Sequence, residues 1–185
     1  MKVAITGTIG SGKSEMSNYL RNKYNLFVFD CDKTNSEILN NNPLILRKDF
    51  SDCFVDDTLD KHKLANLVFN DVDSRKKLES LMHPLILEKM LHNMKKYNPF
   101  FAEVPLLFES GWDKYFDLKV LIVCQKDVAL KRLLDRGLSE KESNERIKNQ
   151  MSVSDKMAKS DVIIYNNLSL VSFYKEIDDW ITNVR

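Results

Sequence analysis

Residues 7–14 read Gly7-Thr8-Ile9-Gly10-Ser11-Gly12-Lys13-Ser14, a complete match to the pattern G-x-x-x-x-G-K-[ST]. An apolar run precedes this stretch and a helical pattern follows it, which is the context that a phosphate-binding loop requires. Glycines let the backbone curl so that successive N–H groups point at one anion, and the next helix turns its positive end toward the same place. A plain glycine-rich turn is the alternative. The clustering of three of the chain's five glycines in this stretch favours a nucleotide-binding P-loop.

Each polar residue of the loop has an expected role. Lys13 should reach the β- and γ-phosphates of ATP and assist catalysis, and the Ser14 hydroxyl should ligate Mg²⁺. Glu15 follows at once; its carboxylate suits the first turn of a helix but stands near the bound phosphates. The loop residues expected to contact ATP are Gly7, Ile9, Gly10, Ser11, Gly12, Lys13, Ser14 and Glu15.

Working outward from the loop, apolar runs of strand length alternate with helical patterns, as in βα units that build a parallel sheet. The expected strands are Val3–Thr6, Phe27–Phe29, Phe100–Leu106, Leu118–Cys124 and Val162–Tyr165. The last helix, from about Leu170 to Ile181, should place Val171, Tyr174, Ile177 and Ile181 on the face that packs on the sheet. The pattern predicts an α/β fold of the P-loop kinase type, a three-layer sandwich around a five-stranded parallel sheet.

Two segments are expected to stand apart from this sheet. Residues 33–97 show no convincing strand but have apolar residues at helical spacing, so they predict a helical insertion for the second substrate. Residues 126–159 are helical and rich in both charges, and we interpret them as a lid. The nucleotide-binding core would then consist of residues 1–32, 98–125 and 160–185, within a single kinase domain.

Composition narrows the class of protein. A net charge of +1 argues against a general nucleic-acid binder, and 43% apolar with 30% charged residues are values typical of globular proteins. The three cysteines, Cys31, Cys53 and Cys124, are far apart in the sequence and fit a reducing compartment. With no leader sequence and no apolar run of membrane-spanning length, we expect a cytoplasmic protein with no membrane association and no obligate protein partner.

A P-loop serves switches, motors and kinases alike, so other residues must distinguish them. No Asp lies three residues before a glycine, and Asn22-Lys23-Tyr24-Asn25 fails the guanine-recognition pattern, which argues against a GTP-binding switch. Asp30-Cys31-Asp32 follows the second expected strand. With a period of two, both carboxylates should emerge on one side where the strand ends, at the edge of the sheet that forms binding crevices. One of them, Asp32, could orient a substrate hydroxyl or could cap the helix expected near Lys33.

Several blocks together resemble the dephospho-coenzyme A kinase family. They occur in the family's order and cover nearly the whole chain: Ile5–Ser14, Val28–Asp32, Leu59–Phe69, Leu81–Ile86, Val104–Glu109, Arg146–Gln150 and Asp161–Asn167. The blocks Leu81-Met82-His83-Pro84-Leu85-Ile86 and Val104-Pro105-Leu106-Leu107-Phe108-Glu109 are the more specific ones. The resemblance implies ATP-dependent phosphorylation of the ribose 3′-hydroxyl of dephospho-coenzyme A, a small-molecule substrate, to give coenzyme A and ADP.

The resemblance also implies roles for single residues. Asp32 matches the family's proposed base, and Arg136 a lid arginine that reaches the phosphates; a solvated helix face is the alternative for Arg136 and for Arg132. His83 and Leu106 lie in blocks that line the coenzyme site, although His83 could simply precede Pro84 at a helix start. Asn166 would frame the adenine or be a turn residue.

Other features leave two alternatives. Shikimate kinases also carry Asp-x-Asp after the second strand, but they have a run of three glycines, and no two glycines are adjacent here. Gluconate and nucleoside kinases belong to the same first alternative. The second is a non-enzymatic, ATP-binding regulatory module, which Lys13, Ser14 and Asp32 together disfavour.

Glu103 and Glu109 flank the end of the third expected strand, and either could act on Mg²⁺ through water.

Overall fold

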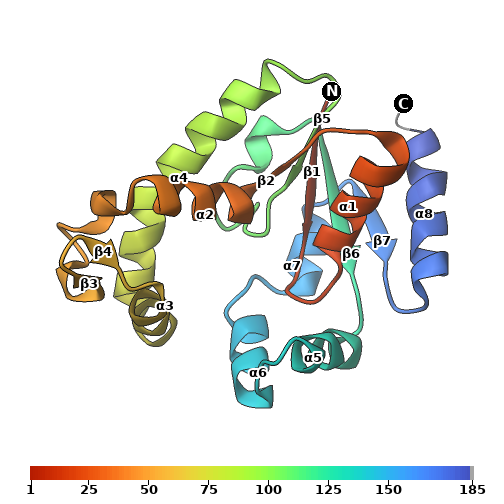
Figure 1. The fold of residues 1–185 in the computed structure, drawn as a ribbon. Helices are drawn as coiled ribbons and strands as arrows, with labels where there is room; N and C mark the ends of the chain where they lie inside the picture. The colour runs from red at the N-terminus through yellow and green to blue at the C-terminus, as the bar shows by residue number, and fades with distance from the viewer. Residues whose placement is uncertain (184–185) are drawn as a thin grey trace. The chain divides into compact units, whose positions relative to one another are not determined.

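A computed structural model describes residues 1–183 of the chain. Its centre is a five-stranded, all-parallel sheet with the order β2-β5-β1-β6-β7 (Figure 1). The strands are β1 (Lys2–Gly7), β2 (Val28–Asp30), β5 (Phe100–Glu103), β6 (Leu118–Val123) and β7 (Val162–Tyr165). The helices attached to this sheet are α1 (Lys13–Tyr24), α5 (Lys126–Asp135), α6 (Glu140–Lys148), α7 (Val153–Ala158) and α8 (Leu170–Thr182). The five expected strands and the α/β class are confirmed.

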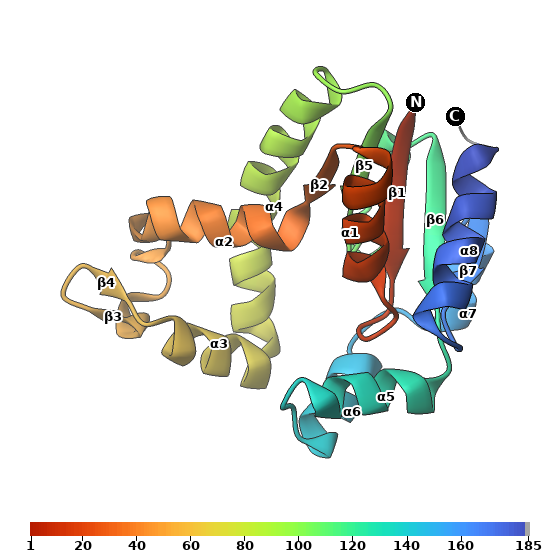
Figure 2. The ribbon, with the colours of Figure 1, turned by 45° about the vertical axis from the view of Figure 1, so that its right-hand side comes forward.

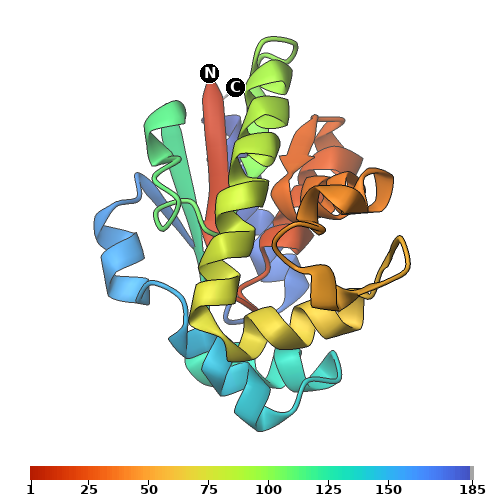
Figure 3. The same ribbon diagram turned by 90° about the vertical axis from the view of Figure 1, so that its left-hand side faces the viewer.

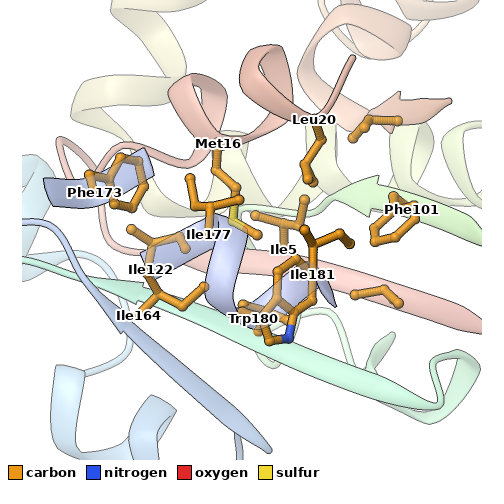
Figure 4. Close-up of a cluster of buried hydrophobic side chains, with 13 residues drawn as sticks. Ile5, Met16, Leu20, Phe101, Ile122, Ile164, Phe173, Ile177, Trp180 and Ile181 are labelled. Atoms are coloured by element: carbon orange, nitrogen blue, oxygen red, sulfur yellow. The ribbon is translucent and has the colours of Figure 1, made fainter. Parts of the chain in front are cut away.

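Strand β1 is central because its side chains are apolar on both faces, as a parallel sheet covered by helices on both sides requires. Val3, Ala4 and Ile5 are fully buried. On one face, α1 and α8 cover the strands with Met16, Leu20, Phe173, Ile177 and Ile181 (Figures 2 and 4). Helix α7 lies on the opposite face, behind the sheet in Figure 1.

Two sequence expectations about these elements are wrong in detail. The third strand ends at Glu103 instead of Leu106, because Pro105 has no N–H with which to continue the ladder. In α8 Ile177 and Ile181 are buried as expected, but Val171 is 77% exposed, and Phe173 and Trp180 face the core in addition. Val171 was grouped with the apolar face because valine is apolar, but it lies on the solvent side of the first turn.

The chain forms two compact units, of which the first contains residues 1–30 and those from 94 onward, and the second residues 31–93. The second unit consists of α2 (Cys31–Asn41), α3 (Lys61–Asn70) and α4 (Val72–Met94), with short 3₁₀ turns (Pro43–Leu46 and Ser51–Cys53) between them. Figure 3 shows α4 as one continuous helix. Sequence analysis missed a two-stranded hairpin, β3 (Phe54–Val55) with β4 (Thr58–Leu59), because two-residue strands carry no periodic signal.

Helix boundaries correct two further expectations. Helix α2 begins at Cys31, so Asp32 is a first-turn residue and not an N-cap, and the strand period that was to align it with Asp30 ends at Asp30. Pro84 lies inside α4, so His83 does not precede a helix start. Within residues 1–183, no helix is both long and apolar enough to cross a bilayer.

Candidate active site

The loop between β1 and α1 has the shape that the motif predicts. Helix α1 begins at Lys13, and Gly12 precedes it in the left-handed region with φ 105°. A Cβ atom on Gly12 would lie 2.2 Å from Nδ2 of Asn166, and one on Gly7 would lie 2.5 Å from the carbonyl oxygen of Ile122. Both approaches are far shorter than a van der Waals contact. Glycine is therefore required at these two positions by packing as well as by backbone conformation.

Lys13 is buried in the loop itself. Its Nζ donates to the carbonyl oxygen of Thr8 at 2.9 Å, and the backbone N–H of Ser11 donates to the same oxygen at 3.2 Å. The ammonium group is therefore held at the loop, and Lys13 as a whole is only 9% exposed. A phosphate entering the loop would meet a cation already in place, with little side-chain entropy left to lose.

The outer side of the loop is held by Arg132 of α5 and by Asn166, which follows β7. The Arg132 guanidinium donates to the carbonyl oxygens of Gly10 (3.2 Å) and Asn166 (3.1 Å) and to Oδ1 of Asn166 (3.0 Å). Asn166 Nδ2 donates to the Ser11 carbonyl oxygen at 2.8 Å. These bonds fix the carbonyls of Gly10 and Ser11 against Arg132 and Asn166.

Gln150 supplies a further contact with the loop. Its Oε1 accepts a hydrogen bond from the backbone N–H of Ile9 at 2.8 Å. Gln150 follows α6 and lies within the segment, residues 126–159, that the sequence suggested as a lid. The next residue, Met151, donates its backbone N–H to Glu109 at 3.1 Å. Glu109 in turn forms a 2.9 Å salt bridge with Lys156, whose side chain is fully buried and also donates to the Pro105 carbonyl.

Ser14 and Glu103 form the polar edge of the loop. The Ser14 hydroxyl donates to Oε1 of Glu103 at 2.8 Å. Glu103 is the last residue of β5 and only 4% exposed, and its second oxygen, Oε2, is buried and accepts no hydrogen bond in the described chain. Asp30 lies opposite Glu103 in the β2–β5 register. A buried carboxylate oxygen left without a donor is costly, and a cation beside it would remove that cost.

The other predicted site residues lie in different parts of the chain. Asp32 is exposed in the first turn of α2, and Arg136 is exposed at the C-cap of α5. Leu106 is half-buried in the loop after β5. His83 is half-buried in α4, and burial lowers the pKa of its imidazole, an effect that the nearby Glu79 opposes. The Glu15 side chain bonds to Tyr174 of α8.

Sequence reasoning missed three contacts of the loop: those of Arg132 and Gln150 with its backbone, and that of the buried Glu103 with Ser14. Arg132 was weighed only as a companion of Arg136, one turn away on the same helix. Gln150 had been noted within a family block but given no role. Of the two glutamates at the end of the third strand, the structure places Glu103 on Ser14 and pairs Glu109 with Lys156. Burial of Glu103 was foreseeable from its position inside an apolar run.

Comparison with known proteins gives a consistent result. The family model described as dephospho-CoA kinase matches residues 1–172. A curated dephospho-CoA kinase of Helicobacter pylori is 34% identical over 95% of this chain and 93% of its own length. The solved dephospho-CoA kinase of Campylobacter jejuni superposes with a TM-score of 0.74 at 31% identity, covering 100% of this chain and 98% of that one.

A more distant likeness concerns the fold alone. A shikimate kinase from Bacteroides thetaiotaomicron superposes with a TM-score of 0.60 over 100% of this chain and 98% of its own, but at only 12% identity. That likeness shows a shared fold and carries nothing about the substrate.

Proposed function

Since this chain belongs to the dephospho-CoA kinase family, we propose that residues 7–15 hold the ATP that the enzyme consumes and that Asp32 orients the acceptor hydroxyl. The reaction is ATP-dependent phosphorylation of dephospho-coenzyme A at its ribose 3′-hydroxyl, the last step of coenzyme A synthesis. The small-molecule acceptor gains the γ-phosphoryl group, and ADP leaves. The observation that supports the residue assignment is the phosphate loop, in which Arg132 and Asn166 bind the Gly10 and Ser11 carbonyls and Lys13 binds the Thr8 carbonyl.

Phosphoryl transfer of this kind requires positioning and charge neutralisation more than covalent chemistry. Lys13 would neutralise charge on the β- and γ-phosphates while the N–H groups of the loop hold their oxygens. Arg136, exposed at the end of α5, would reach the equatorial oxygens of the transferred group, where a planar guanidinium suits spread charge. Asp32 would accept a hydrogen bond from the 3′-hydroxyl and receive its proton as the new P–O bond forms.

The residues present fit a bound Mg²⁺. Ser14 and Glu103 present a hydroxyl and a carboxylate side by side, and the buried Oε2 of Glu103 accepts no hydrogen bond in the described residues. Mg²⁺ prefers such oxygen ligands and usually keeps several waters. No ready-made cluster of three acidic, His or Cys ligands exists among residues 1–183, as expected where phosphate and water supply the remaining ligands. When bound, the ion would neutralise charge on the β- and γ-phosphates.

The finer division of the chain remains part of the proposal. We assign acceptor binding to the helical insertion, residues 33–97, with His83 and also Leu106 of the following loop as contacts, and a lid function to residues 126–159. Asn166, whose side chain donates to the Ser11 carbonyl of the phosphate loop, is also assigned to the ATP site. The three cysteines are buried thiols, which supports a reducing cytoplasmic location.

The decisive experiment is a turnover assay with dephospho-coenzyme A as sole acceptor. Asp32→Asn should retain ATP binding by calorimetry but lose about 10²-fold or more in kcat, because the acceptor hydroxyl loses its orienting base. Asp73→Asn is the matched control, since Asp73 is also an acidic residue in the first turn of a helix of the insertion. If Asp32→Asn instead unfolds the protein while activity per folded molecule is unchanged, Asp32 has only a structural role.

Two further variants test the nucleotide side of the assignment. Lys13→Ala should abolish turnover by removing a cation that acts on the transferred group. Arg136→Ala should lose turnover with ATP affinity largely retained. Normal turnover in the Arg136 variant would remove that residue from the site.

A further inference from the structure

Glu15 places a carboxylate directly after the loop that binds ATP. It occupies the first turn of α1, next to Ser14, and its side chain is half-buried. A negative charge there benefits from the positive end of α1, but it also stands beside a ligand that carries about four negative charges. A carboxylate free to turn toward the phosphates would repel them and would compete with them for the positive end of α1. A contact that holds the Glu15 carboxylate away from the phosphates would therefore favour ATP binding.

Tyr174 of α8 supplies that contact. Its hydroxyl donates a hydrogen bond to Oε1 of Glu15, although the two residues are 159 positions apart in the sequence. The bond joins the helix that follows the phosphate loop to the last helix of the chain, and these two helices cover the same face of the sheet (Figure 2). The hydrogen bond to the Glu15 carboxylate also raises the pKa of the Tyr174 hydroxyl, so this group remains a donor near neutral pH.

The ring of Tyr174 is itself held in place. It stacks on Tyr19 of α1 with centroids 4.0 Å apart and planes within 7° of parallel. The Tyr19 hydroxyl donates to Asp178 of α8 at 2.9 Å. Asp178 also accepts hydrogen bonds from Tyr24 at 2.6 Å and from Lys23 at 2.7 Å. Three donors from α1 thus converge on one carboxylate of α8, and the stacked tyrosine pair above it has little freedom to move.

We propose that Tyr174 is a positioning residue for ATP, because it binds the Glu15 carboxylate on the α8 side and keeps it from turning toward the triphosphate. The inference rests on the proposed function, in that it requires ATP in the loop of residues 7–14. It adds a residue more than 150 positions from that loop to the determinants of nucleotide affinity. The stacked Tyr19 holds the ring of Tyr174 in place, and the Tyr174 hydroxyl then holds the Glu15 carboxylate.

A double-mutant cycle tests this directly. Tyr174→Phe keeps the stacked ring but removes the donor, and we expect about a fivefold rise in both the KM for ATP and the Kd of an ATP analogue, with kcat within about twofold of wild type. Glu15→Gln removes the charge and supplies the background in which Tyr174→Phe should have no further effect on the Kd. The double variant should match Glu15→Gln, because the penalty depends on the charge at position 15. Raising the salt from roughly 0.05 M to 0.5 M should shrink the effect of Tyr174→Phe, since screening weakens charge repulsion.

The control and the contrary outcomes are equally defined. Tyr97→Phe removes a hydroxyl from another stacked tyrosine, on Phe27, far from Glu15 in the sequence, and should leave the Kd unchanged. If Tyr174→Phe fails to fold, Glu15→Asp keeps the charge on a stem too short for the same bond and should also raise the Kd. If Tyr174→Phe raises the Kd equally in the Glu15→Gln background, or does not raise it at all, this inference is wrong while the proposed function is unaffected. A wild-type protein that binds no ATP analogue overturns the proposed function and this inference with it.

Discussion

The phosphate loop and the helical insertion are held by contacts of very different range. The partners of the loop, Gln150, Arg132 and Asn166, are separated from it by 141, 122 and 155 residues. In the insertion, Lys61 reaches Asn40 across 21 residues, and Lys77 forms a salt bridge with Asp49. A motif of eight consecutive residues thus takes its shape from the whole nucleotide unit, whereas the insertion is stabilised within its own segment. Substitutions should separate these two regimes.

The largest effect is expected for Gly12→Ala. An alanine at this position would have to adopt φ 105°, and its Cβ would lie 2.2 Å from Asn166 Nδ2. Asn166 would have to move away from the loop, so binding of an ATP analogue should be lost. Gly137→Ala is the matched control, because Gly137 also has a positive φ, of 88°, but open space around its Cβ. It should lose only about 1–2 kcal/mol of stability from backbone strain. Calorimetric binding near the wild-type value in Gly12→Ala would contradict a loop shaped by its distant partner.

The second effect concerns one salt bridge from each region. Lys156→Met in the nucleotide unit should lower the free energy of unfolding by about 3–5 kcal/mol, because it leaves Glu109 without its buried partner. Lys77→Met in the insertion removes the salt bridge to Asp49. Because the Lys77 side chain is 53% exposed, this change should lower the free energy of unfolding by only about 0–1 kcal/mol. Urea denaturation of both variants gives the comparison. Equal losses would mean that the long-range contact is worth no more than the local one.

A third test weakens the loop without touching a glycine. Arg132→Ala removes every hydrogen bond from the guanidinium to Gly10 and Asn166, and the stranded acceptors should cost about 1–3 kcal/mol. We expect the KM for ATP to rise by about tenfold as the loop loses its outward anchor, a change of about 1.4 kcal/mol in binding. Lys131→Ala removes a neighbouring exposed cation on the same helix and serves as control. A rise of similar size in the control would point to general charge and not to the anchored carbonyls.

The smallest effect is expected in the insertion. Burial lowers the pKa of His83 below its usual 6.5, so at low pH the unfolded chain binds more protons at this position than the folded one. The contribution of His83 to stability is therefore complete above about pH 6.5 and is lost as the pH falls through the lowered pKa. Replacing it in His83→Gln should flatten the stability profile between roughly pH 7 and 5. Thermal melts of both proteins at each pH measure the two stability profiles. Parallel profiles would show that His83 does not titrate in this way.

What the sequence could predict follows the same division. The strand runs around Val3 and Leu118 and the loop at Gly7–Ser14 were recognisable because burial on both faces and phosphate binding demand particular residue types within a few positions. The partners of the loop were not recognisable, since nothing near Gln150 or Arg132 in the sequence specifies a carbonyl or amide more than a hundred residues away. The family resemblance located the blocks that contain Gln150 and Asn166, but it did not locate Arg132 or any of these contacts.

Errors in the sequence analysis also have local causes. The strand period was extended from Asp30 to Asp32, although a helix begins at Cys31. A proline after His83 was taken as a sign of a helix start, but α4 runs through it. In both cases a short-range rule was correct in general and was overridden by the packing of the complete element.

The strand order has a consequence for how the chain is made. Strand β1 pairs only with β5 and β6 in the described sheet, so Lys2 meets Phe100 and Val3 meets Leu118. While the ribosome delivers the residues from 8 to 103, at about 5–20 per second, this apolar strand has no neighbour to pair with for roughly 5 to 19 s. The insertion, whose contacts close short loops, can form during that interval. A strand made before both of its neighbours is thus among the last parts of this sheet to become native, and chaperone dependence should centre on residues 2–7.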